Sequence, residues 1–197
     1  MPSIQYIDMK YTLSLLGLNV LIFAAYVYTT PNALWTIHQL LAGTPVSYNE
    51  LFPNIITYMF GHAGIAHLMM NMLMLVIFGR SMEGKAGWCI IPVYCTAGIV
   101  GAVAHMWFID IPLIGASAAV SGLFGAAIVY RTISAGSIVY YVMVLNVLPL
   151  FGVLSMIGFG DPGVSYVSHL GGVAAGAVAG VLFRYITHPK DVGALLH

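Results

Sequence analysis

The chain has 197 residues, of which 60% are hydrophobic and only 6% are charged, and its mean hydropathy is +0.96. A soluble domain carries about a quarter charged residues, so this composition excludes a soluble globular protein and predicts a membrane protein. The formal net charge is zero, which argues against a nucleic-acid partner.

Six segments are apolar enough to be transmembrane helices, each of which needs about 20 mostly apolar residues. In chain order they cover residues 11–29, 55–78, 87–107, 113–133, 138–157 and 168–186. Little of the chain remains outside them, so we expect a single all-α membrane domain over residues 1–197, with a six-helix core at about 11–186. No small-residue cleavage signature follows the first span, which we therefore interpret as a retained helix rather than a signal peptide.

The basic residues predict how these spans are oriented. If the spans alternate in direction, every Lys and Arg falls on the same side of the membrane: Lys10, Arg80, Lys85, Arg131, Arg184 and Lys190. The positive-inside rule then places both termini in the cytoplasm. We expect an integral, multi-pass membrane protein, located in the inner or plasma membrane if the cell is prokaryotic.

The connection over residues 31–53 is too long for a simple turn. Its segment "NALWTIHQLLAG" repeats apolar residues at helical spacing and contains Trp35, a residue type that anchors proteins at membrane interfaces. The connection is either an interfacial helix in the outer leaflet or an ordinary amphipathic loop.

The second span carries polar residues only in its outer half. His67 and Asn71 are four residues apart and share a helix face, while His62 lies about 140° around the helix from His67. The segment "MLMLVIF" that follows Asn71 is wholly apolar. An intramembrane histidine is energetically unfavourable and indicates a functional site.

Two rows of small residues recur at four-residue spacing in the fourth and sixth spans: Ser117, Ser121 and Gly125, and Gly172, Gly176 and Gly180. Such rows let two helices approach closely, and plain helix packing is one interpretation of them. His169 lies three residues before Gly172, so packing of the two rows would bring His169 and Ser117 together. A hydroxyl beside an imidazole is an activated nucleophile with its base.

A small-solute or metal-ion transporter is an alternative function, with His62, His67 and His169 as zinc ligands. A transport path needs polar groups across the whole bilayer, whereas here they are confined to the outer half. His62 and His67 are also five residues apart, unlike the i, i+4 pair of a helical zinc site. We therefore expect no metal and no cofactor.

Several of these segments resemble the rhomboid family of intramembrane serine proteases. "GASAAVSGLFG" is similar to the family's Gly-x-Ser-Gly motif, and "HAGIAHLMMN" to its His-x4-His-x3-Asn motif. "SHLGGVAAG" resembles the family's catalytic-histidine helix, and "GRSMEGKAG" its Gly-x-x-x-Glu turn. The resemblance extends over about residues 50–185.

The resemblance implies an intramembrane serine endopeptidase that hydrolyses peptide bonds in or near transmembrane segments of other membrane proteins. Ser117 would be the nucleophile and His169 the general base, then the general acid. Asn71, His67 and the Ser117 backbone N–H would form the oxyanion hole. The enzyme would work within the lipid bilayer and need no cofactor, and its oligomeric state stays open.

The resemblance also makes Gly115, two residues before the serine, and His62, the first histidine of its motif, accessory candidates. Ala118 stands where the family has a glycine, so the backbone there must tolerate a Cβ atom. Ser121 stands where some members carry a tyrosine that packs on the catalytic histidine, so that packing must come from elsewhere. An inactive relative that binds membrane clients is the remaining alternative, and the intact Ser117 and His169 argue against it.

Overall fold

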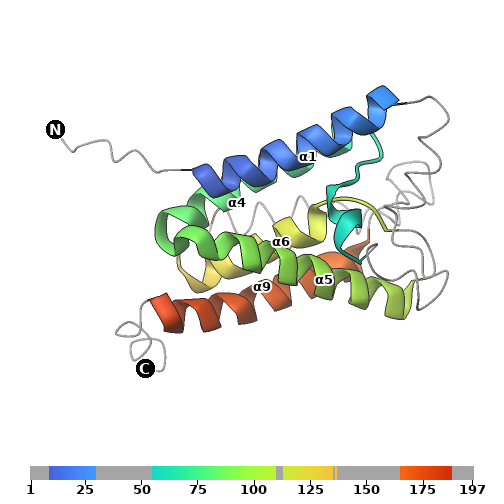
Figure 1. Ribbon diagram of the computed structural model, residues 1–197. Coiled ribbons are helices and arrows are strands. Elements are labelled where there is room, and N and C mark those ends of the chain that lie inside the picture. Colours follow the sequence, from blue (N-terminus) through green and yellow to red (C-terminus); the bar gives the residue numbers. More distant parts are fainter. Residues whose placement is uncertain (1–8, 30–54, 110–112, 135, 137–164, 188–197) are drawn as a thin grey trace.

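The computed structural model describes residues 9–29, 55–109, 113–134, 136 and 165–187, which form helices and the short segments between them (Figure 1). The elements, with 3₁₀-helices written η, are α1 (Lys10–Thr29), η1 (Tyr58–Phe60), α4 (Ile65–Ala86), η2 (Gly87–Cys89), α5 (Ile90–Phe108), α6 (Ser117–Val129) and α9 (Tyr166–Thr187). The all-α class is thus confirmed for the part of the chain that the structure describes.

Among the described residues, two helical stretches are long and apolar enough to cross a membrane. They are Ile65–Phe108, which runs through α4, η2 and α5, and Tyr166–Thr187, with mean hydropathies of 1.7 and 1.5. Large apolar side chains point outward from both, for example Trp107 and Leu182, whose exposed fractions are 81% and 60%. Soluble proteins rarely expose large contiguous apolar surface, and such a surface suits contact with lipid.

The bounds of α1, α5 and α9 agree with predicted spans to within a few residues. The fifth predicted span, 138–157, and the predicted interfacial segment, 31–53, lie outside the described residues. The count of six transmembrane helices, the single domain over residues 1–197 and the orientation in the membrane therefore stay predictions.

The second predicted span, 55–78, is placed wrongly, because α4 begins and ends later. Its start is set by Gly61, which is extended with ψ 149°, and by Gly64, whose φ and ψ are 176° and 175°. Neither conformation continues a helix. The fourth predicted span, 113–133, is also too long, since α6 has 13 residues and starts only at Ser117.

Glu83 explains why α4 continues past the apolar run. Its buried carboxylate accepts hydrogen bonds from the backbone N–H groups of Tyr11 at 2.9 Å and Thr12 at 2.8 Å, and from the Thr12 hydroxyl at 2.6 Å. The first N–H groups of a helix lack intrahelical acceptors and carry partial positive charge, so they stabilise a buried carboxylate. Glu83 thereby ties α4 to the start of α1.

Helices α6 and α9 pack backbone against backbone. A Cβ atom added to any glycine of the α9 row would contact α6. Gly172 faces Ala118, Gly176 faces Gly122, and Gly180 faces Ala126. At the first two pairs the added atom would collide with a carbonyl oxygen. The pairs advance in the same direction along both helices, so α6 and α9 run parallel.

The α6 side of this contact agrees only in part with the predicted row of Ser117, Ser121 and Gly125. Gly125 belongs to the contact, because a Cβ atom there would collide with the Val173 carbonyl oxygen, whereas the other contacting residues are Ala118, Gly122 and Ala126. One residue turns a helix by about 100°, so Ser117 and Ser121 lie on a neighbouring face of α6. Gly122 lies between two helices: a Cβ atom there would collide with Ala97 of α5, and its carbonyl group meets Gly176 of α9.

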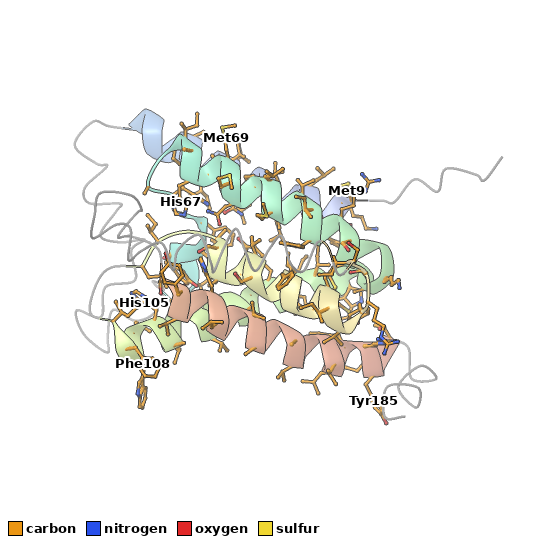
Figure 2. All side chains as sticks on the ribbon, turned by 180° about the vertical axis from the view of Figure 1, so that it is seen from behind. Met9, His67, Met69, His105, Phe108 and Tyr185 are labelled. Carbon is orange, nitrogen blue, oxygen red and sulfur yellow. The ribbon has the colours of Figure 1, made fainter. Side chains whose placement is uncertain are left out.

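Figure 2 shows how the ends of the helices are arranged. Met9, before the start of α1, and Tyr185, near the end of α9, lie at one end of the bundle, whereas His67 and His105 lie at the opposite end. We call the latter the polar end. Because α9 finishes near Tyr185 and α6 runs parallel to it, both of these helices begin at the polar end.

The glycine contact makes a testable prediction about stability. Gly176→Ala should lower the free energy of unfolding by about 1–3 kcal/mol, because the methyl group collides with the Gly122 carbonyl oxygen. Gly17→Ala is the matched control, since Gly17 is also helical and nothing lies within 4 Å of its Cβ position. The control should be neutral or stabilising by up to about 1 kcal/mol. Thermal unfolding in detergent measures both, and equal stability of the two variants would contradict the packing.

Candidate active site

Ser117 is the first residue of α6. It is partly exposed, whereas residues 118–127 behind it are all buried. The first four N–H groups of an α-helix have no intrahelical acceptor and carry partial positive charge. The Ser117 hydroxyl and backbone N–H therefore lie together where an anionic group is stabilised.

The approach to Ser117 is shaped by Gly115, over which the imidazole of His67 packs. Gly115 has φ +118°, and a Cβ atom there would lie 2.7 Å from Cε1 and 2.8 Å from Nε2 of His67. Its N–H donates to the Tyr58 carbonyl at 3.0 Å, and the Tyr58 hydroxyl donates to the Gly98 carbonyl of α5 at 2.6 Å. Glycine is thus required both for its torsion and for the space that His67 fills.

The hydrogen bond to Nδ1 favours one tautomer of a neutral His67 ring. Nδ1 accepts a long hydrogen bond, 3.4 Å, from the Ala63 N–H. A neutral imidazole that accepts at Nδ1 carries its proton on Nε2. The Nε2–H donor then lies on the Gly115 side of the ring, where it can stabilise negative charge beside Ser117.

Asn71 follows His67 by one turn of α4 and is buried. Its Nδ2 donates to the His67 carbonyl at 2.9 Å, so both residues lie on one face of the helix as the sequence predicts. An amide group has two N–H donors. One fixes the orientation of the Asn71 side chain, and the second is left for another acceptor.

His169 lies buried in the first turn of α9. The ring of Tyr166 packs edge-on against its imidazole, with 6.3 Å between ring centroids and an interplanar angle of 85°. This contact supplies the aromatic packing that Ser121 cannot provide. The spacing of Tyr166 and His169 indicates this contact, because residues three apart are neighbours on one helix face.

The chain neighbours of Ser117 and His169 meet at Gly101 of α5. A Cβ atom on Gly101 would lie 2.6 Å from the Ala118 methyl carbon and 2.7 Å from the Ser168 carbonyl oxygen. Together with the parallel packing of α6 and α9, this contact holds the starts of the two helices side by side at the polar end. A nucleophile and a base at these two helix starts can act on one substrate bond.

Ala118 occupies its position without backbone strain. Arg131 is the only non-glycine residue with positive φ in the described part of the chain, so Ala118 has an ordinary backbone conformation. Its methyl group packs against Gly101, whose missing side chain provides the space. The departure from the family's glycine is therefore compensated across the interface with α5.

His62 is buried beside His67, with 5.3 Å between their ring centroids, and the ring of Phe23 from α1 lies 6.5 Å away. His62 thus packs against the residue that covers Gly115. Within the residues that the structure describes, no three His, Cys, Asp or Glu side chains are grouped so as to hold a metal ion.

Comparisons with known proteins identify the family of the chain. The model of the Rhomboid domain matches residues 49–186. RHOMBOID-like protein 4 of Arabidopsis thaliana is 32% identical over 131 residues, which cover 64% of this chain and 33% of that protein. Rhomboid protease GluP of Bacillus subtilis (strain 168) is 31% identical over 119 residues, covering 60% and 23% of the two chains.

A third relative, the mitochondrial RHOMBOID-like protein 6 of Arabidopsis thaliana, is 29% identical over 138 residues, which cover 65% of this chain and 42% of that protein. The chain thus spans less than half the length of these curated relatives. The family match itself covers more than half of the chain. The chain therefore belongs to the Rhomboid domain family and is a polytopic membrane protein.

Proposed function

We propose that this protein is an intramembrane serine endopeptidase that hydrolyses peptide bonds in or near the transmembrane segments of other membrane proteins. The observation that carries the proposal is the position of Ser117. It begins α6 two residues after Gly115, which His67 covers, and beside the point where α5 contacts Ala118 and Ser168. One relative, of Bacillus subtilis, bears the name rhomboid protease.

In this proposal Ser117 Oγ attacks the carbonyl carbon of the scissile bond while His169 accepts the hydroxyl proton. The negative charge that develops on the carbonyl oxygen is stabilised by the Ser117 backbone N–H, His67 Nε2–H and the second N–H of Asn71. His169 then gives its proton to the leaving amine, which releases the first product. A water molecule, deprotonated by His169, then attacks the acyl group bound to Ser117 Oγ, and His169 returns the proton to Oγ as the ester bond breaks and the second product leaves.

The length of α6 supports a site below the membrane surface. Its 13 residues span about 20 Å, whereas the hydrocarbon core of a bilayer is about 30 Å thick. A helix this short cannot reach both membrane surfaces. If α6 ends near the cytoplasmic surface, its first residue lies inside the bilayer. Ser117 then lies at the depth of a substrate's own transmembrane segment.

The basic residues support an orientation with the polar end away from the cytoplasm. Lys85 Nζ donates to the Tyr130 carbonyl at 3.4 Å, and Arg184 donates to the Val129 carbonyl at 2.5 Å. Both contacts lie at the C-terminal end of α6, which is opposite the polar end. Positively charged side chains are stabilised at the C-terminal end of a helix, where the helix dipole is negative. They are also enriched on the cytoplasmic side of membrane proteins.

The serine–histidine dyad predicts the effect of two substitutions. Ser117→Ala and His169→Ala should each lower cleavage of a single-span reporter protein by at least about 10³-fold, because either one removes the nucleophile or its base. Ser121→Ala is the matched control, since it removes a buried hydroxyl one turn further along the same helix. Wild-type cleavage by Ser117→Ala would refute the assignment.

Asn71 tests the oxyanion hole separately. Asn71→Ala should lower kcat by about 10–1,000-fold with little change in KM, because the donor acts on charge that exists only in the transition state. Steady-state cleavage of the reporter in detergent measures both constants, and thermal unfolding measures the folded fraction. If activity falls only in proportion to the folded fraction, Asn71 is a structural residue.

A further inference from the structure

A second histidine–serine pair lies beside the proposed dyad. His105 Nδ1 and Ser165 Oγ are 2.6 Å apart, and the two residues are 1% and 6% exposed. His105 belongs to the last turn of α5, and Ser165 directly precedes α9. The contact therefore joins two helices through residues that are 60 positions apart in the chain. Figure 2 shows His105 at the polar end of the bundle.

Ser165 is the N-cap of α9. Its Oγ accepts a hydrogen bond from the Ser168 N–H at 3.2 Å, and its carbonyl accepts from the Ser168 hydroxyl at 2.8 Å and from the His169 N–H at 3.2 Å. A side-chain oxygen that bonds the third residue of a helix fixes the geometry of the first turn. The main chain of His169 is thus held directly by Ser165.

These contacts give the Ser165 hydroxyl a structural role rather than that of a second nucleophile. Its oxygen is buried between the His105 ring and the Ser168 N–H. A nucleophile must be open to the substrate carbonyl, as the partly exposed Ser117 is. The His105–Ser165 pair therefore stabilises the structure of the protein and does not react with a substrate.

Helix α5 contacts the first turn of α9 at two points that lie one turn apart. Gly101 presses against the Ser168 carbonyl oxygen, 2.7 Å from its Cβ position, and His105 holds Ser165. The glycine contact with α6 begins only at Gly172, so these two contacts hold the turn of α9 that precedes it. The direction in which the His169 imidazole points depends on the geometry of that turn.

We propose that His105 and Ser165 form a clamp that fixes the first turn of α9 and thereby positions His169 for proton transfer. His105 is a positioning residue in this account, because it acts through Ser165 and touches neither the substrate nor Ser117. The inference rests on the proposed function, in which His169 is the general base. It adds a residue of α5 to a site otherwise built from α4, α6 and α9.

Kinetics of four single variants and one double variant test the clamp. His105→Leu keeps the bulk of the side chain and removes its hydrogen bond, whereas His105→Asn places an amide group near the position of Nδ1. His105→Leu should lower kcat by about 10–100-fold and leave KM within about twofold, because a displaced base slows the chemical step without weakening substrate binding. His105→Asn should recover most of the wild-type kcat.

Ser165 gives a parallel pair of variants. Ser165→Ala should lower kcat as His105→Leu does, and Ser165→Thr, which keeps the hydroxyl, should not. Because the two residues act as a unit, the double variant with His105→Leu should be no slower than the slower single variant. Ser165→Ala removes the hydroxyl and leaves His105 and the contact at Gly101 in place. Wild-type kcat in this variant would therefore overturn the clamp.

Hydrogen exchange provides a measurement that is independent of turnover. In the Ser117→Ala background, the backbone amides of Ser168 and His169 should exchange faster with His105→Leu than with His105→Asn. Unchanged protection together with unchanged kcat in His105→Leu would refute the clamp. Failure of the wild-type protein to cleave the reporter, or cleavage by Ser117→Ala, would instead refute the proposed function, so the two failures are distinguishable.

Discussion

The close parallel contact between α6 and α9 is the constraint on which the rest of the structure depends. Lipid is as apolar as a leucine side chain, so helices in a bilayer associate through close van der Waals packing rather than through the hydrophobic effect. Gly172 and Gly176 meet the carbonyl groups of Ala118 and Gly122, which leaves no room for a side chain. The same contact sets the start of the His169 helix beside the start of the Ser117 helix.

Polar groups gather where these helices begin. Helix starts present N–H groups that need acceptors, and a buried polar group in a membrane must find its partner within the protein. The described residues meet this need with contacts that also build the site: Tyr58 holds Gly115, Asn71 bonds to the His67 carbonyl and Ser165 caps α9. The opposite end of α6 is bound instead by Lys85 and Arg184. The bundle therefore has two chemically different ends.

The sequence predicts the all-α class and the glycine row of α9, because hydropathy and spacing within one segment carry that information. The residues of the proposed site rest on polar groups placed within apolar spans and on the resemblance to the family, and they stay predictions. The sequence misplaces two residues of the α6 row and the end of α4, which depend on contacts with other helices, and the start of α4, which the backbone of Gly61 and Gly64 sets. The Glu83 cap of α1 and the Tyr58 contact with Gly115 join segments 71 and 57 residues apart, and no local pattern encodes such pairs. The dyad itself remains a proposal that the local geometry supports.

Labelling with a serine-directed fluorophosphonate tests the central claim most directly, because it reports the activated nucleophile without requiring a known substrate. The reagent is applied to the protein in membranes, and the modified residue is located by peptide mass spectrometry. The account predicts an adduct on Ser117 in the wild-type protein, none on Ser121, and a large loss of labelling in His169→Ala. An adduct on Ser121, or labelling of Ser117 that does not depend on His169, would contradict it.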